Sequence, residues 1–505
     1  MKNFIRLLCA LLALLMLFTC LVACGGTKET ETETESEQTS TVETETDNTR
    51  YDDWGRVYIE DTVPTDLSFK DAADNTVTFL CRDNSTYWKL EMDVDELIDE
   101  TVNDAIYYRN VAVEERLGVV IDAIYQAGDY NDMPTWNQTV RNSVLNRTHD
   151  FDSAAIYASQ GSALATEGIY YDVNKIEYLD LEKPWWNFAL LEEASLFDAL
   201  YFLGGDIAIS QVSRASLIAY NKKLAEENLG GVNLYELVDS HEWTIDKLYE
   251  LSSTLWDDNN NSGVIDDGDT VGFLGISGEG VGSMDVWVPA MGITITTKNS
   301  DGIPELTMYS PRSISAFEKV HRLYKQNAGG LDGNTEKTTF VNGNVMFTKT
   351  MLEGCEGFRD MTDSYGVLPL PMFDEDQGAY YNVPNNTCSL IVVLSDCETT
   401  ELVGATLELM AAESYRQVTP KYYEICLKSK YSEGVDDARM YDLILSGIRF
   451  DFGFIYSTVS INYVGALFRI LDRDFAATYE SRSESYETLL GQLIDKLEAV
   501  AYMTP

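Results

Sequence analysis

Short strand-like runs alternate with amphipathic helical patterns along most of this chain, and that alternation restricts the fold more than any other feature. The expected strands cover residues 75–81, 119–124, 151–157, 216–220, 271–276 and 389–394. Between them, apolar residues recur at helical spacing, as from Leu97 to Ile106. Because a strand, a helix and a second strand in succession form a parallel pair, the sequence predicts an α/β fold built on mainly parallel sheets.

The first residues have the pattern of a secretory signal. Two basic residues lie within Met1–Arg6, and an almost unbroken apolar run covers Leu7–Leu21. The tetrapeptide that ends at Cys24 (LVAC) resembles a bacterial lipobox, which implies a lipoprotein signal peptide over 1–23 and lipidation of Cys24. A transmembrane anchor is the alternative, but the run is shorter than the ~20 residues of a membrane span. We expect a lipid anchor at the extracellular face of the cell membrane.

Threonine and glutamate repeats then fill Thr27–Asp53, with almost no apolar content. Such a segment cannot bury enough surface to fold, and its glutamates repel one another. We therefore expect a disordered tether over 24–60. About 450 residues remain, enough for two or more domains at about 100–200 residues each.

The formal net charge of the chain is −47 at pH 7. Since nucleic acid is bound by a basic surface, this charge argues against a nucleic-acid partner. Cysteines are few in the expected mature chain, at Cys81, Cys355, Cys388, Cys397 and Cys426. No CxxC pair indicates a zinc or redox site, and both a disulfide among the last four and buried free thiols fit the pattern.

The most specific chemical pattern is the run of twelve residues from Asp258 to Asp269. Oxygen-bearing side chains fall at its positions one, three, five, nine and twelve, and Gly263 takes position six, where a calcium loop turns sharply. The expected ligands are Asp258, Asn260, Ser262, the carbonyl of Val264, Asp266 and Asp269. A polar surface turn is the alternative. The pattern predicts a structural calcium ion of modest affinity.

The segments around this loop indicate its role. A helix over Ile245–Trp256, capped by Thr244, leads into the loop, and a strand follows it. A calcium sensor of the EF-hand class has a helix on both sides. We therefore expect a clip that stabilises the fold, and not a switch.

Several segments together resemble the extracellular solute-binding proteins of ABC importers, specifically the family-1, sugar-binding-type lipoproteins of Gram-positive bacteria. They are the lipobox, SLIAYNKKL (216–224), EWTIDKLYELSSTLWDDNNNSGVIDDGDTVGF (242–273), FVNGNVMF (340–347), YGVLPLPMFDEDQ (365–377) and MAAESYRQVTPKYYE (410–424). The resemblance implies a two-lobe periplasmic-binding-protein-like fold (type II) with lobes joined by hinge strands. The N-terminal lobe would comprise 70–208 and 372–428, and the C-terminal lobe 209–371 and 429–505.

The resemblance also implies a function, namely delivery of a carbohydrate, with an oligosaccharide expected, to ABC permease subunits by a monomeric receptor. An anchored glycan-binding or sensor-coupled protein and a secreted carbohydrate-active enzyme are the alternatives. The three histidines are scattered and form no HExxH motif, and no GxSxG motif is complete. We expect a binding protein and not an enzyme.

Ligands of open α/β sheets bind beyond the carboxyl ends of the strands, and this rule selects candidate residues. Sugar recognition needs an aromatic face for the ring and planar polar groups for the hydroxyls. The candidates are Asp83, Asn84, Trp88, Gln160, Asp206, Arg214 and Tyr381, with Trp287 where the family often places an aromatic platform. Each tryptophan could instead belong to the core, and Arg214 could instead form an ion pair between the lobes.

Overall fold

Two large β-sheets organise the part of the chain that the computed structural model describes, namely residues 57–278, 284–333, 340–428, 435–456 and 465–503. The chain divides into two units, Met1–Arg50 and Tyr51–Pro505, and all described residues belong to the second. The expected signal peptide, Cys24 and nearly all of the expected tether therefore lie outside the described residues, as does the side chain of Cys426.

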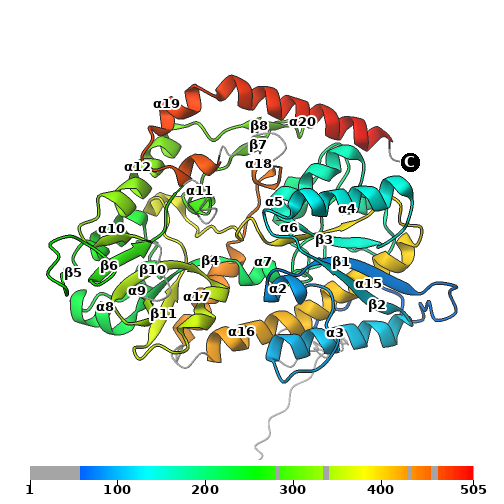
Figure 1. Ribbon diagram of the computed structural model, residues 1–505, viewed down its shortest axis with the longest axis horizontal. Coiled ribbons are helices and arrows are strands. Elements are labelled where there is room, and N and C mark those ends of the chain that lie inside the picture. Colours follow the sequence, from blue (N-terminus) through cyan, green and yellow to red (C-terminus); the bar gives the residue numbers. More distant parts are fainter. Residues whose placement is uncertain (1–56, 279–283, 334–339, 429–434, 457–464, 504–505) are drawn as a thin grey trace, which may run out of the picture. The chain divides into compact units, whose positions relative to one another are not determined.

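The first sheet has the strand order β12–β3–β1–β2 (Figure 1). Its strands are β1 (Thr76–Arg82), β2 (Val120–Gln126), β3 (Ser153–Tyr157) and β12 (Ser389–Val393). β1 pairs in parallel with β2 and β3, whereas β12 runs antiparallel to β3. Every residue of β3 and β12 is buried, as their nearly continuous apolar sequence predicts.

The second sheet has the order β11–β4–β10–β6–β5, and β9 also pairs with β6. Its strands are β4 (Ser216–Asn221), β5 (Trp256–Asp257), β6 (Thr270–Gly275), β9 (Gly330–Asp332), β10 (Val345–Met351) and β11 (Tyr365–Leu368). β6 is parallel to β9 and β10, but β4 is antiparallel to β10 and β11. The expectation of mainly parallel sheets is thus wrong for this sheet, because sequence alternation does not report strand direction across long connections.

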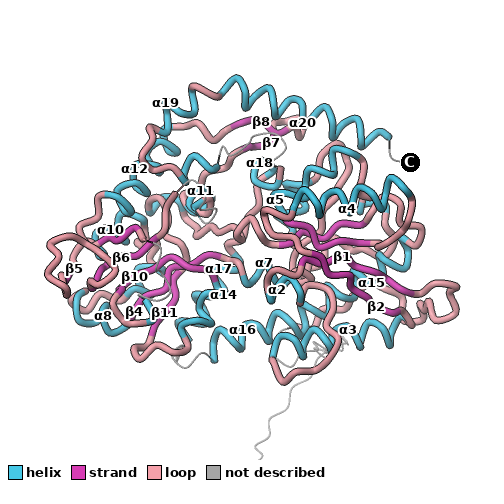
Figure 2. The backbone as a smooth tube through the Cα atoms, in the orientation of Figure 1, coloured by secondary structure: helices cyan, strands magenta, loops and turns pink. Residues whose placement is uncertain are grey.

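Helices flank the strands of both sheets (Figure 2). On the side of the first sheet these are α2 (Thr86–Lys89), α3 (Thr101–Leu117), α4 (Met133–Asn146), α5 (Ala158–Gly161), α6 (Phe188–Ala194), α15 (Thr400–Glu413) and α16 (Thr419–Lys428). On the side of the second they are α8 (Lys222–Asn228), α9 (Leu234–Asp239), α10 (Ile245–Ser252), α11 (Trp287–Ala290), α12 (Pro311–Lys325), α14 (Leu352–Cys355) and α17 (Val435–Ser446). The small pair β7 (Thr296–Lys298) and β8 (Pro304–Leu306), with α18 (Phe452–Ile455), α19 (Phe475–Glu480) and α20 (Ser483–Met503), complete the chain.

Two crossing segments connect the large sheets and are hydrogen-bonded to each other. The outgoing segment contains α7 (Ile209–Ser213) and leads into β4, and the returning segment covers 382–388 and leads into β12. The Asn382 amide donates from Nδ2 to the carbonyl of Ser216 (2.9 Å) and accepts from the Ser216 N–H (3.3 Å). The N–H of Asn385 donates to the carbonyl of Arg214 (3.0 Å). The returning segment is thereby fixed against the outgoing one.

The first described residues are fastened to the body of the fold through Asp61. Its carboxylate contacts Arg116 at the end of α3 (2.8 Å) and Arg416 in η6 (Ser414–Val418) at 3.3 Å. Burial acts to raise the pKa of Asp61, but Arg116 and Arg416 outweigh burial and hold that pKa below its usual range. We call this group the Asp61 clamp. It ties the chain start to helices that cover the first sheet.

Other expectations meet the structure as follows. α20 contacts the short helix η1 (Ser162–Glu167), which lies in the expected N-terminal lobe. The sequence assigns 429–505, and with it α20, to the C-terminal lobe. The lobe boundaries stay predictions. Cys81, Cys355, Cys388 and Cys397 are free thiols. None of the helices in the described part of the chain is long and apolar enough to cross a bilayer.

A buried carboxylate joins α15 to a tryptophan corner. The Glu408 carboxylate accepts hydrogen bonds from the indole N–H groups of Trp185 (3.1 Å) and Trp186 (2.9 Å) and from the backbone N–H of Asp180 (3.1 Å). Every partner is a donor, so no neutral amide can satisfy them all.

We expect the substitution Glu408→Gln to destabilise the protein by roughly 1–3 kcal/mol, because the new NH₂ group faces an indole donor that then lacks an acceptor. Urea unfolding followed by tryptophan fluorescence measures the change. The exposed Glu401→Gln on the same helix is the control. Equal unfolding midpoints for wild type and Glu408→Gln would contradict a structural role of this carboxylate.

Candidate ligand-binding site

Two arginines meet at the edge of the first sheet where β1 and β3 end. Arg82 is the last residue of β1 and is fully buried. Its Nη2 donates to the carbonyl of Thr387 (2.9 Å) and to Oγ of Ser389 (2.8 Å), both of the return into β12. The guanidinium lies 4.2 Å from the ring centroid of Trp88 and 5.2 Å from that of Tyr157, the last residue of β3.

Arg214 reaches the same place from the outgoing crossing. Its guanidinium lies 4.8 Å from the centroid of Trp88, and its Nη1 donates to Oγ1 of Thr387 (2.5 Å). Thr387 thus binds one arginine through its carbonyl and the other through its hydroxyl. We call Arg82, Trp88, Tyr157, Arg214 and Thr387 the arginine cluster. Carboxyl ends of parallel strands are the usual ligand edge of an open α/β sheet, so this cluster is the candidate site.

Several donors of the cluster lack an acceptor among the described residues. They are Nε and Nη1 of Arg82, Nε of Arg214 and the indole Nε1 of Trp88. Unpaired buried donors cost about 1–3 kcal/mol each, so they are rare in folded proteins unless a ligand or water completes them.

Acidic side chains approach the arginine cluster from two sides. Glu91 is buried near Arg82, and burial raises the pKa of Glu91, although Ser210, Ser389 and Arg82 act in the opposite direction. From α14, which follows β10 of the second sheet, Glu353 places Oε1 3.5 Å from Nη2 of Arg214. The Tyr87 hydroxyl also donates to Glu356, directly after α14. Side chains at α14, on the side of the second sheet, therefore contact Arg214 of the cluster and its neighbour Tyr87.

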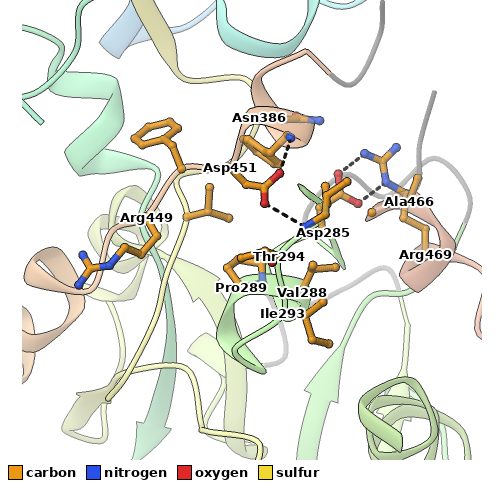
Figure 3. A pocket seen from close by; sticks show the side chains of 15 residues that line it. Asp285, Val288, Pro289, Ile293, Thr294, Asn386, Arg449, Asp451, Ala466 and Arg469 are labelled. Carbon is orange, nitrogen blue, oxygen red and sulfur yellow. Dashed lines mark hydrogen bonds and ion pairs between the residues drawn. The ribbon is translucent and has the colours of Figure 1, made fainter. Parts of the chain in front are cut away.

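A small cavity lies on the other side of the returning segment (Figure 3). Asn386, the neighbour of Thr387, lines it, together with apolar groups of α11, Phe450 and Phe454. Its volume is about 60 Å³. Ligand pockets usually measure about 300–1,000 Å³. The small cavity is therefore too small for a sugar unless it widens.

Three charged groups of that cavity, Asp285, Arg469 and Asp451, have direct partners. Arg469 forms a two-contact ion pair with the buried Asp285, with Nε and Oδ1 at 2.6 Å (Figure 3). Asp451 accepts from the N–H groups of Ile295 (2.9 Å) and Thr296 (3.2 Å). Burial raises the pKa of Asp451 to about 7, although these donors act in the opposite direction.

A larger hollow of about 690 Å³ lies along α12 and residues 471–474. Its charges pair with one another, since Asp246 contacts Lys319 (2.8 Å) and Arg322. It is not at the carboxyl edge of either sheet, and we do not assign the ligand to it.

Comparison with known proteins gives a fold. No family model and no curated protein matches this sequence. Among solved structures, the chain is similar to the galacto-N-biose-/lacto-N-biose I-binding protein of the ABC transporter from Bifidobacterium longum, in complex with lacto-N-biose, with a TM-score of 0.55, 13% identity and coverage of 84% of this chain and 98% of that chain. The chain is also similar to a cyclo/maltodextrin-binding protein complexed with maltotetraose. That comparison has a TM-score of 0.51 and 12% identity, and it covers 84% of this chain and 97% of that chain.

This chain has the fold of ABC-transporter sugar-binding proteins. The expected two-lobe α/β architecture is confirmed, with one large sheet in each lobe. The solved structures to which it is similar are binding proteins and not enzymes.

In this binding-protein fold, the expected ligand residues separate into groups. Trp88 and Arg214 meet in the arginine cluster, as described above. Asp83 and Asn84 follow β1, and Asn84 accepts from the N–H of Gly128. Tyr381 lies 5.6 Å from the guanidinium of Arg449, beside the small cavity.

Three expected residues have structural partners away from the cluster. The carbonyl of Gln160 accepts from Asn137 (3.2 Å), and the carboxylate of Asp206 accepts from Thr419 (2.5 Å). Trp287 is fully buried and donates to the hydroxyl of Tyr324 (3.2 Å). It therefore presents no face to a ligand here, because its ring belongs to the core of the second sheet.

Sequence reasoning missed Arg82, Tyr157 and Thr387. A signal for Arg82 was present, since a basic residue directly follows a buried apolar strand and lies at the expected ligand edge. Thr387 had no such signal, because its two contacts depend on how the returning segment packs.

The expected calcium loop connects β5 to β6. Trp256 and Asp257 of β5 pair with Val271 and Thr270 of β6. The sequence predicts that the preceding helix ends at Trp256, but α10 ends at Ser252. The reason is that Trp256 and Asp257 form strand pairs with β6. Thr244 caps α10 as expected, accepting from the N–H of Lys247 (3.2 Å).

Inside the loop, acceptors turn toward the loop's own backbone. Asp258 accepts from the N–H groups of Ser262 (3.0 Å) and Gly263 (2.8 Å), and Gly263 has the positive φ of 75° that its sharp turn requires. Asp269 is fully buried and accepts from the indole of Trp256 (3.0 Å). Among the described residues, no three Asp, Glu, His or Cys side chains lie close enough together to hold a metal ion. The calcium site stays a prediction.

Asp451 predicts a measurable pH dependence. Its folded pKa of about 7 exceeds the ordinary value of 3.8, so the folded state holds the proton more tightly and stability falls as pH rises between these values. Between pH 5.5 and 7.5 we expect wild type to lose about 2 kcal/mol more than Asp451→Asn does. Denaturant unfolding at both values measures this, with the exposed Asp301→Asn as control. A parallel loss in Asp451→Asn would refute the assignment.

Proposed function

We propose that this protein is the substrate-binding protein of an ABC importer and captures a carbohydrate, specifically an oligosaccharide, between its lobes. The observation that carries the proposal is its two-sheet fold, shared over most of its length with proteins solved with lacto-N-biose and with maltotetraose. The arginine cluster at the carboxyl edge of the first sheet supplies hydrogen-bond donors without an acceptor among the described residues, as recognition of a saccharide requires.

Lobe closure is the proposed mechanism. Arg214–Glu353 and Tyr87–Glu356 already link the two lobes across the candidate site. A ligand that contacts residues of both lobes binds the closed state better than the open state and shifts the population toward closure. Closure then presents one surface, formed by both lobes, to permease subunits.

The anchoring and the extracellular position are part of the proposal. They rest on the signal pattern and on Cys24, which the lipobox resemblance selects for lipidation. We further propose a calcium ion in the loop, held by Asp258, Asn260, Ser262, Val264, Asp266 and Asp269. Oxygen ligands at this spacing suit a hard divalent cation, and the charge of only three carboxylates suits a calcium-rich exterior.

The function is tested by titrating the chain without residues 1–50 with neutral and acidic oligosaccharides and with peptides. We expect calorimetry to show saturable binding of a saccharide, together with a raised melting temperature, because a ligand that binds only the folded state stabilises it. Binding of peptides with no response to any saccharide would refute the substrate class. Cleavage of the saccharide would refute the binding-protein assignment.

The calcium ion is tested by melting curves in EGTA and in 0.1–10 mM calcium, on the order of the affinities of extracellular modules. We expect calcium to raise the melting temperature of wild type and not that of Asp258→Ala. The control is Asp267→Ala, at a position that does not carry a ligand in the calcium-loop spacing. A wild type insensitive to calcium would remove the metal.

A further inference from the structure

We propose that the captured saccharide carries an anionic group, a carboxylate or a sulfate, and that the arginine cluster recognises it. The inference rests on the proposed function, because it specifies the ligand of the same site. It concerns Arg82 and Arg214, which lie together at the carboxyl edge of the first sheet with Trp88 between them in the contact network.

The first argument is the surplus of donors. Arg82, Arg214 and Trp88 together hold the four N–H-bearing atoms noted above that lack an acceptor among the described residues. A carboxylate or sulfate offers only acceptors, and its hydrogen bonds with guanidinium groups are shorter and stronger than those of a neutral hydroxyl. An anionic group satisfies this surplus better than a neutral sugar does.

The second argument is charge. In the described part of the chain no carboxylate oxygen lies within 4.0 Å of Arg82. Two other buried arginines have such a partner at short distance, Arg469 in Asp285 and Arg416 in Glu413 (2.6 Å). The buried Arg109 has none among the described residues, but its donors are bonded to Asn110, Ser414 and the carbonyls of Glu91 and Met92. Burial raises the pKa of Glu91, which is the main acidic group that acts electrostatically on Arg82. Arg214 has only the 3.5 Å contact with Glu353, and Arg82 has no direct ion pair among the described residues.

The third argument is the position of Glu353. Its carboxylate comes from the opposite lobe and lies 3.5 Å from Arg214, where an acidic ligand group would lie between the lobes. At this distance the contact is an ion pair without a hydrogen bond, so a ligand carboxylate that approaches to about 2.8 Å competes with it favourably. Glu353 therefore acts as a replaceable internal anion.

The test compares three disaccharides on the chain without residues 1–50 at 0.15 M NaCl by calorimetry: a galacturonate dimer, its carboxyl-reduced neutral counterpart, and a sulfated galactose dimer. We expect at least one acidic dimer to bind at least tenfold more tightly than the neutral one. Arg214→Gln should weaken the acidic dimer at least tenfold, and by a clearly larger factor than it weakens the neutral one. Whichever acidic dimer binds more tightly distinguishes carboxylate from sulfate.

The control is Arg141→Gln, which removes a surface ion pair with Glu167 (2.6 Å) far along α4 and should leave all three affinities unchanged. Glu353→Gln serves as a second variant if Arg214→Gln does not fold, and it should tighten acidic binding by removing the competing carboxylate. Equal affinity for acidic and neutral dimers, or neutral binding alone, overturns the inference and leaves the proposed function intact. Binding of none of the three, nor of any other saccharide, overturns both.

Discussion

The hydrogen bonds between the two crossing segments are the constraint on which the candidate site depends. Asn382 satisfies both the N–H and the carbonyl of Ser216, and Asn385 binds the carbonyl of Arg214. Because this pairing fixes the returning segment, Thr387 stands where it accepts from both arginines. A shift of the crossings would therefore move both guanidinium groups together, and hinge geometry and ligand geometry are coupled through one threonine.

Buried charge is handled differently in different parts of the molecule. Where stability alone is at stake, each charge meets direct partners, as Arg469 does with Asp285 and Glu408 does with two indoles. At the arginine cluster the compensation is incomplete, because Glu353 of the other lobe lies 3.5 Å from Arg214 and no described carboxylate oxygen lies within 4.0 Å of Arg82. An incompletely compensated cation at a lobe boundary is costly in an empty site and becomes useful when a ligand completes it.

Much of the fold follows from local sequence patterns, and the candidate site follows only in part. Strand β3 and the Thr244 cap can be predicted from the sequence because they depend on neighbouring residues alone. The direction of β4 and the end of α10 were missed, since both are decided by pairing with distant strands. Trp88 and Arg214 were selected by their place after strands, whereas Trp287 shows that such a place does not determine whether a ring faces solvent or core.

The Asp61 clamp has a consequence for where the chain can be cut without disturbing the fold. A protease that cuts before Tyr58 leaves the clamp whole, and the shed domain keeps both ion pairs of Asp61. A cut after Asp61 removes the carboxylate that Arg116 and Arg416 share, and exposes the first-sheet helices to fraying. A shortened recombinant chain that is to keep the clamp therefore starts upstream of residue 58.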